Sequence, residues 1–130
     1  MDSKKKIFII DDDSFLLDMY ALKFNQSNFI VTTALGSEQA LEKLRLGSAF
    51  DIILLDIMMP VMDGFELMEK MKEENLAQGS IKIILSNRGQ PSDIARGESL
   101  GASGYIVKAS STPTEVIEKV NVIISSITKK

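Results

Sequence analysis

The stretch Phe50-Asp-Ile-Ile-Leu-Leu-Asp-Ile-Met-Met-Pro-Val-Met-Asp-Gly64 decides how the rest of the chain is arranged. Its apolar run Ile52–Leu55 is too short for a typical helix and is bounded by carboxylates, which favours a strand buried on both faces of a parallel sheet. Asp56 follows this strand, and Pro60 then predicts a loop. From this stretch alone, Asp56 is either a functional carboxylate at the carboxyl edge of a sheet or an ordinary cap or loop residue.

The composition predicts one folded domain that spans residues 1–130, with 45% apolar and 25% charged residues. The net charge of −3 gives no electrostatic reason to expect binding to nucleic acid or to an anionic membrane. The apolar run at residues 7–10 is too short for a signal peptide or a transmembrane segment, so we expect a cytoplasmic protein.

The chain contains no cysteine and no histidine. This absence excludes thiol nucleophiles, disulfides, zinc sites of the usual ligand types, histidine-based catalytic triads and phosphohistidine carriers. Covalent or metal chemistry must therefore use carboxylates, hydroxyls and lysines. Sites rich in oxygen ligands suit Mg²⁺, with Mn²⁺ as the other candidate.

Short apolar runs alternate with helical patterns along the whole chain. We predict strands at residues 6–10, 29–34, 52–55, 81–85 and 103–107. The expected helix starts are Ser14, Ser37, Asp63, Pro91 and the capping box that begins at Thr112. The apolar stripes expected for the first and last helices are Leu17, Tyr20, Leu22 and Phe24, and Val116, Val120, Ile123 and Ile127.

This alternation predicts an α/β fold: a flavodoxin-like (βα)5 doubly wound parallel sheet with strand order 2-1-3-4-5. In that order the first and third strands are neighbours, and their carboxyl ends carry Asp11, Asp12 and Asp56. Ser86 and Lys108 follow the fourth and fifth strands, so they are expected at the same edge.

Three converging carboxylates repel one another, since two charges 4 Å apart interact by roughly 4 kcal/mol at an effective dielectric constant near 20. A divalent cation removes this cost, so Asp11, Asp12 and Asp56 predict a Mg²⁺ site. The alternative for the first two is that acidic residues simply begin a helix. That alternative leaves Asp56 unexplained.

A cleft with a cation, a lysine and a hydroxyl fits phosphoryl transfer, which depends on positioning and on neutralising phosphoryl oxygens. Lys108 is the expected charge partner and Ser86 a short-range donor. The nucleophile must be a carboxylate because the chain has no histidine. Asp56 is the best placed, and it would form an acyl phosphate.

These residues closely resemble the receiver domain of bacterial response regulators, the phosphoacceptor module of two-component signalling. The matching segments are 9–13, 53–64, Ser86 and 101–108, and together they cover essentially the whole chain.

The resemblance implies that Asp56 is the phosphoacceptor and that Lys108 binds a phosphoryl oxygen. Asp11, Asp12 and Asp56 would hold Mg²⁺ together with the Met58 backbone carbonyl. Ser86 would be the switch hydroxyl, coupled to rotation of the Tyr105 ring; the other interpretation of Tyr105 is an ordinary half-buried aromatic.

The resemblance also implies partners. The phosphodonor would be a histidine kinase or a histidine phosphotransfer protein. The output would be a rearranged surface around the fourth helix, fifth strand and fifth helix, read by a downstream target protein or effector domain. The charged residues of the fourth helix would either pair across a phosphorylation-dependent homodimer or form an ordinary solvated face; they are Asp93, Arg96 and Glu98.

The sequence departs from the family pattern at two positions. Alanine follows Lys108 where receivers usually have proline in a cis peptide, so we predict a trans bond or a re-routed loop there. Asn87 replaces a small residue after the switch hydroxyl. Our hypothesis is that Asn87 and the Met58 side chain tune the lifetime of the acyl phosphate.

Two other functional classes compete with a phosphorylated receiver, which would not act as an enzyme on other substrates. One is a degenerate receiver that acts as a phosphorylation-independent binding module. The other is a Mg²⁺-dependent hydrolase or nuclease on a related acidic scaffold. The sequence leaves open whether the chain acts alone or is part of a larger regulator.

Overall fold

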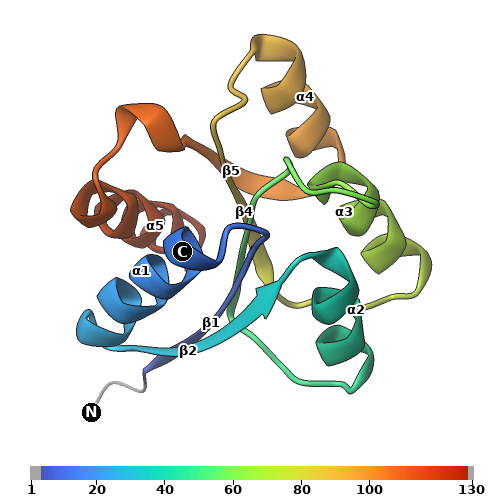
Figure 1. The fold of residues 1–130 in the computed structure, drawn as a ribbon, viewed down its shortest axis with the longest axis horizontal. Coiled ribbons are helices and arrows are strands. Elements are labelled where there is room, and N and C mark those ends of the chain that lie inside the picture. Colours follow the sequence, from blue (N-terminus) through green and yellow to red (C-terminus); the bar gives the residue numbers. More distant parts are fainter. Residues whose placement is uncertain (1–3, 129–130) are drawn as a thin grey trace.

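The computed structural model describes residues 4–128 and shows five parallel strands alternating with five α-helices. The strand order is β2-β1-β3-β4-β5, which confirms the predicted flavodoxin-like topology (Figure 1). The strands are β1 (Lys5–Asp11), β2 (Phe29–Leu35), β3 (Ile52–Leu55), β4 (Ile81–Ser86) and β5 (Ala102–Val107). The helices are α1 (Ser14–Gln26), α2 (Ser37–Arg45), α3 (Gly64–Glu73), α4 (Pro91–Ser99), α5 (Pro113–Thr128) and a short 3₁₀ turn, η1 (Lys108–Ser110).

The central strand β3 is fully buried, with no exposed surface on any of its four residues. Ile10 of β1 pairs with Leu55, and Leu55 in turn pairs with Ile84 of β4. Because all three strands run in the same direction, the residues that follow them meet at one edge of the sheet.

Helices cover both faces of the sheet and separate the core into two clusters. Helices α1 and α5 lie on one face, and α2, α3 and α4 lie on the other (Figure 1). Alternate residues of β1 serve the two clusters: Ile7 and Ile9 pack with α1 and α5, whereas Phe8 and Ile10 pack with α2 and α3. This period-2 alternation is what a strand buried on both faces requires.

Two predicted helix caps were wrong. Asp13, not Ser14, caps α1, because its carboxylate accepts hydrogen bonds from the backbone N–H groups of Phe15 and Leu16. Gly36 precedes α2 with φ +89°, and the Ser37 hydroxyl instead donates to the Met62 carbonyl at 2.9 Å. Ser37 therefore ties α2 to the loop that follows β3.

The other capping predictions are confirmed. Asp63 and Glu66 form a reciprocal capping box at the start of α3. Thr112 and Glu115 exchange the same pair of hydrogen bonds at the start of α5. The capping box at Asp63 thus fixes the direction in which α3 leaves the loop after β3.

The apolar stripes were predicted only in part. Leu22 on α1 is 57% exposed, because residues 17, 20 and 24 follow the helical period and residue 22 does not. On α5, Ile127 in the last turn is 37% exposed, and Ile117 and Ile124 join the core in addition to Val116 and Val120.

No cis peptide bond occurs in the part of the chain that the structure describes, so the bond between Lys108 and Ala109 is trans as predicted. The backbone continues from Lys108 directly into η1. Within residues 4–128, no helix is long and apolar enough to cross a membrane.

Gly64 is required by a close backbone approach below the loop after β3. A Cβ atom at this position would lie 2.4 Å from the Asp56 carbonyl oxygen and 2.6 Å from the Ile57 Cα atom. Both are backbone atoms, which cannot move aside as a flexible side chain can. The Gly64 N–H also donates to the Ile57 carbonyl at 3.0 Å, so the start of α3 is fixed against the end of β3.

We predict that Gly64→Ala lowers the free energy of unfolding by about 2–3 kcal/mol, because the added Cβ overpacks against the backbone. Gly79→Ala is the matched control, since nothing lies within 4 Å of a Cβ there; we expect a change within about 1 kcal/mol. Urea denaturation measures both. Equal losses in the two variants would contradict the argument.

Candidate functional site

Three carboxylates gather where β1 and β3 end. Asp11 is the last residue of β1, Asp12 follows it, and Asp56 follows β3. One carboxylate oxygen from each lies within 4.8 Å of the others. Asp11 and Asp56 are buried, at 3% and 6% exposure, and Asp12 is exposed. The structure thus brings together the three residues that the sequence predicted as metal ligands.

Lys108 joins this cluster from the end of β5. Its ammonium donates to Asp11 Oδ2 at 2.7 Å and to Asp56 Oδ2 at 2.8 Å, with only 8% of its side chain exposed. Burial lowers the pKa of Lys108, but the hydrogen bonds to the two carboxylates outweigh it and raise the pKa above its usual value. Lys108 is therefore a fixed positive charge between two buried aspartates.

The charge of this cluster suits one divalent cation. Burial raises the pKa of Asp11, and the hydrogen bond from Lys108 opposes that shift. Three carboxylates and one ammonium carry a formal charge of −3 + 1 = −2. Their oxygen ligands are those that Mg²⁺ prefers, and exposed Asp12 gives access from solvent. The donor set therefore fits a magnesium ion.

The loop after β3 holds the Asp56 carboxylate from the other side. The Met58 N–H donates to Asp56 Oδ1 at 3.0 Å. Further along the loop, the Met62 N–H donates to the Pro60 carbonyl at 2.8 Å around Val61, which has φ +69°. This is a γ-turn with a β-branched residue in the left-handed region, a strained conformation at the edge of the site.

Ser86 ends β4 and is fully buried at the same edge of the sheet. Its hydroxyl oxygen accepts a hydrogen bond from the Arg88 N–H at 3.3 Å. No hydrogen bond joins Ser86 to Asp56 among the described residues, so the hydroxyl is near the cluster without being part of its ionic network.

Tyr105 is half-buried on β5, and its hydroxyl donates to the Arg88 carbonyl. Burial, reinforced by the negative charge of Asp93, raises the pKa of Tyr105 to about 12. The phenol is therefore a neutral donor at physiological pH. It connects β5 to the loop that follows Ser86.

The two residues that we expected to modulate the site both face solvent. Asn87 is exposed and makes no hydrogen bond within the described part of the chain. The Met58 side chain is 50% exposed. Asn87 directly follows Ser86, and Met58 lies two positions after Asp56.

The pairing of Arg88 with Asp93 was not predicted from the sequence. We had expected Asp93 to lie on a charged face of the fourth helix, but it is only 7% exposed. Its carboxylate accepts hydrogen bonds from the Arg88 guanidinium at 2.8 Å and from the Gln90 N–H at 3.3 Å. A carboxylate at the third position of a helix that opens with Pro91 was a usable signal, because it can reach back to the N-terminal N–H groups.

Arg88, in the loop between β4 and α4, consequently makes contacts with β4, α4 and β5. Its N–H reaches Ser86, its guanidinium reaches Asp93 and its carbonyl accepts from Tyr105. The guanidinium of Arg96, in α4, lies over the Phe65 ring, 4.5 Å from its centroid. The α4 charges that we considered for a dimer interface are therefore used partly within the domain.

The chain matches the family model described as the response regulator receiver domain over residues 7–121. It is 33% identical over 124 residues to the response regulator SaeR of Staphylococcus epidermidis, covering 95% of this chain and 52% of that protein. It is 31% identical over 120 residues to the alkaline phosphatase synthesis transcriptional regulatory protein PhoP of Bacillus subtilis, covering 92% and 48%. The chain spans about half the length of these curated relatives.

Solved structures with the same architecture are similar over their whole length. A CheY-like response regulator receiver domain protein from Methanospirillum hungatei superimposes with a TM-score of 0.83 at 28% identity, covering 95% of this chain and 96% of that one. The chemotaxis response regulator CheY4 of Vibrio cholerae gives 0.82 at 25% identity, covering 92% and 98%.

We predict that Lys108→Met lowers the free energy of unfolding by about 3 kcal/mol in EDTA, because it leaves two buried carboxylates without a counter-charge. Added Mg²⁺ should stabilise the variant more than the wild type, since the cation then compensates both carboxylates. Urea denaturation with and without Mg²⁺ measures both effects. Lys23→Met is the control, because Lys23 is exposed on α1. A Lys108 variant as stable as the wild type in EDTA would contradict the prediction.

Proposed function

Because this chain belongs to the response regulator receiver domain family, we propose that it is the phosphoacceptor module of a two-component phosphorelay and that Asp56 accepts the phosphoryl group. One observation carries this proposal: the buried Asp56 carboxylate lies between the Lys108 ammonium and the Met58 N–H at the carboxyl edge of the sheet. We further propose that residues 1–130 form a single receiver domain.

In the proposed reaction, an Asp56 oxygen attacks the phosphorus of a phosphohistidine on the donor. The P–N bond breaks, its electron pair returns to the imidazole, and an acyl phosphate forms on Asp56. Lys108 exchanges its hydrogen bond with Asp56 Oδ2 for one to a phosphoryl oxygen. A magnesium ion held by Asp11, Asp12, Asp56 and the Met58 carbonyl would neutralise the remaining negative charge.

The proposed switch uses the loop between β4 and α4. The Ser86 hydroxyl would turn from the Arg88 N–H toward the new phosphoryl group. Because the Tyr105 hydroxyl is bound to the Arg88 carbonyl, movement of this loop would also move the Tyr105 ring. The surface around α4, β5 and α5 would then present the output.

The proposed partners follow from the family and from the relatives. The donor is a histidine kinase or a histidine phosphotransfer protein. The curated relatives are about twice as long as this chain, and one of them is named as a transcriptional regulatory protein. A downstream target protein or an effector domain, and a phosphorylation-dependent homodimer, remain proposals for the output.

In this proposal the domain is a cytoplasmic signalling module that catalyses only its own phosphorylation and dephosphorylation. The competing function is a phosphorylation-independent binding module with the same fold. The ionic cluster favours the first, because three carboxylates and a buried lysine at one edge serve no evident purpose in a pure binding module. A direct test of phosphorylation separates the two.

We predict that acetyl phosphate and Mg²⁺ add one phosphoryl group to the wild type and none to Asp56→Asn, as read by intact mass. Asp51→Asn is the matched control, because Asp51 lies just before the other end of β3 and is exposed. It should still be labelled. No adduct on the wild type, with Mg²⁺ bound, would favour the binding-module alternative.

We predict that Asn87→Ala changes the rate at which the acyl phosphate is lost by about twofold or more, because this exposed amide without a partner lies next to Ser86. The loss of phosphate after removal of the donor measures the rate. Ser48→Ala, far along the chain on the exposed turn before β3, is the control. Equal rates of phosphate loss in the wild type and Asn87→Ala would contradict the hypothesis.

A further inference from the structure

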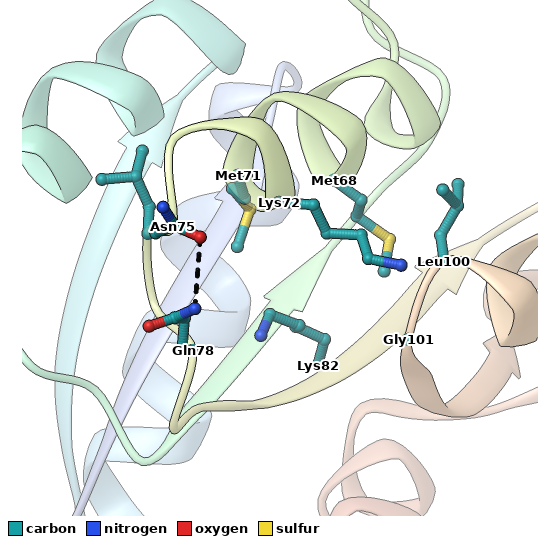
Figure 2. Close-up of a pocket in the computed structure, with 9 residues that line it drawn as sticks. Met68, Met71, Lys72, Asn75, Gln78, Lys82, Leu100 and Gly101 are labelled. Carbon is teal, nitrogen blue, oxygen red and sulfur yellow. Dashed lines mark hydrogen bonds between the residues drawn. The ribbon is translucent and has the colours of Figure 1, made fainter.

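A pocket of about 380 Å³ opens at the opposite edge of the sheet from Asp56. It lies between the end of α3, the loop at residues 74–80, the start of β4 and the turn after α4 (Figure 2). Strand β4 begins at Ile81 and ends with Ser86 at the edge that carries the ionic cluster. Lys82 therefore lies at the opposite edge of the sheet. The pocket is therefore separate from the proposed phosphorylation site.

The base of the pocket is apolar. Met68 and Met71 of α3 are almost fully buried, and Leu76 and Leu100 are half-buried beside them. Thioether side chains adapt to ligands of different shape. The volume is within the range of small-molecule pockets, which are mostly apolar with a few polar groups at defined places.

Two lysines supply the charge of the pocket, and no carboxylate lines it. Lys72 is exposed, and its side chain makes no hydrogen bond or ion pair within the described residues. Lys82 is half-buried and donates to the Ala77 and Ser80 carbonyls at 2.7 and 3.3 Å, which leaves the third N–H of its ammonium free. Burial, reinforced by Lys72, lowers the pKa of Lys82, as expected for uncompensated positive charge.

Lysines often occur at helix C-termini because they complement the helix dipole. Here the carbonyls at the C-terminal ends of α3 and α4 already accept hydrogen bonds from backbone N–H groups. These carbonyls include those of Lys70, Met71 and Arg96. Figure 2 shows the Lys72 side chain crossing the pocket toward Leu100. Its ammonium is therefore placed over the apolar base, where it is available to a ligand.

We propose that this pocket binds a small amphipathic anion, a carboxylate or phosphate monoester with an apolar tail. The tail packs on the half-buried Leu76 and Leu100 above Met68 and Met71, and the anionic group lies between Lys72 and Lys82. The Asn75 side chain accepts a hydrogen bond from Gln78 through its oxygen, which leaves its amide nitrogen as a further donor. The proposal does not depend on phosphorylation of Asp56.

The test uses octanoate and octyl phosphate as probes, titrated into the ¹⁵N-labelled protein and followed by amide chemical shifts and calorimetry. Octanol has the same kind of tail without the charge, and inorganic phosphate has the charge without the tail. Lys72→Gln removes one ammonium, and Lys23→Gln on α1 is the matched control. Comparing the two octyl probes distinguishes a carboxylate site from a phosphate site.

We expect at least one octyl anion to shift the amides of residues 71–82 and 100–101. Lys72→Gln should weaken this binding about fivefold, the effect of losing one exposed ion pair, while Lys23→Gln leaves it unchanged. The proposal is overturned if neither anion binds, if the shifts lie elsewhere, if octanol binds as tightly as the anions, or if Lys72→Gln has no effect.

Discussion

The contact of the Lys108 ammonium with Asp11 and Asp56 is the interaction on which the rest of the site depends. It joins the ends of β1, β3 and β5, which are far apart in sequence, through hydrogen bonds of 2.7 and 2.8 Å. Buried charges are tolerated only when they are paired, so the lysine is what allows two carboxylates to lie at 4% and 7% side-chain exposure. With this lysine the cluster still carries a formal net charge of −2, which is the condition for taking up a divalent cation.

Next to this contact, the backbone holds one carboxylate oxygen of Asp56 in place, whereas the loop after β4 is held less firmly. Gly64 brings α3 against the end of β3, and the Met58 N–H holds Asp56 Oδ1. The loop after β4 is held by individual hydrogen bonds through Arg88 rather than by core packing. A rigid acceptor beside a loop held by a few polar contacts is a suitable arrangement for converting a covalent change into movement, because few interactions need to be exchanged.

The pocket at the opposite edge of the sheet has a lining of the reverse charge. Lys72 and Lys82 border an apolar pocket without any acidic lining residue, whereas the carboxyl edge carries three aspartates. The two edges are connected by β4, which carries Lys82 near one end and Ser86 at the other. The domain thus has two chemically distinct ends, and only the acidic one was evident from motifs.

The topology of the sheet and the composition of the acidic cluster could be predicted from the sequence. Uninterrupted apolar runs such as Ile52–Leu55 require a sheet covered on both faces, and parallel strands must end at one edge, so Asp11, Asp56 and Lys108 could be placed together without coordinates. The hydrogen-bond partners of several polar side chains could be identified only in the folded structure. Asp13 rather than Ser14 caps α1, and Asp93 pairs with Arg88, through contacts between residues close in sequence, whereas Ser37 bonds to the loop after β3, which is distant in sequence. The Ser37 contact depends on distances between segments that local pattern does not encode. The lysine pocket at the far edge depends on such distances as well, because it forms only where α3, β4 and α4 meet.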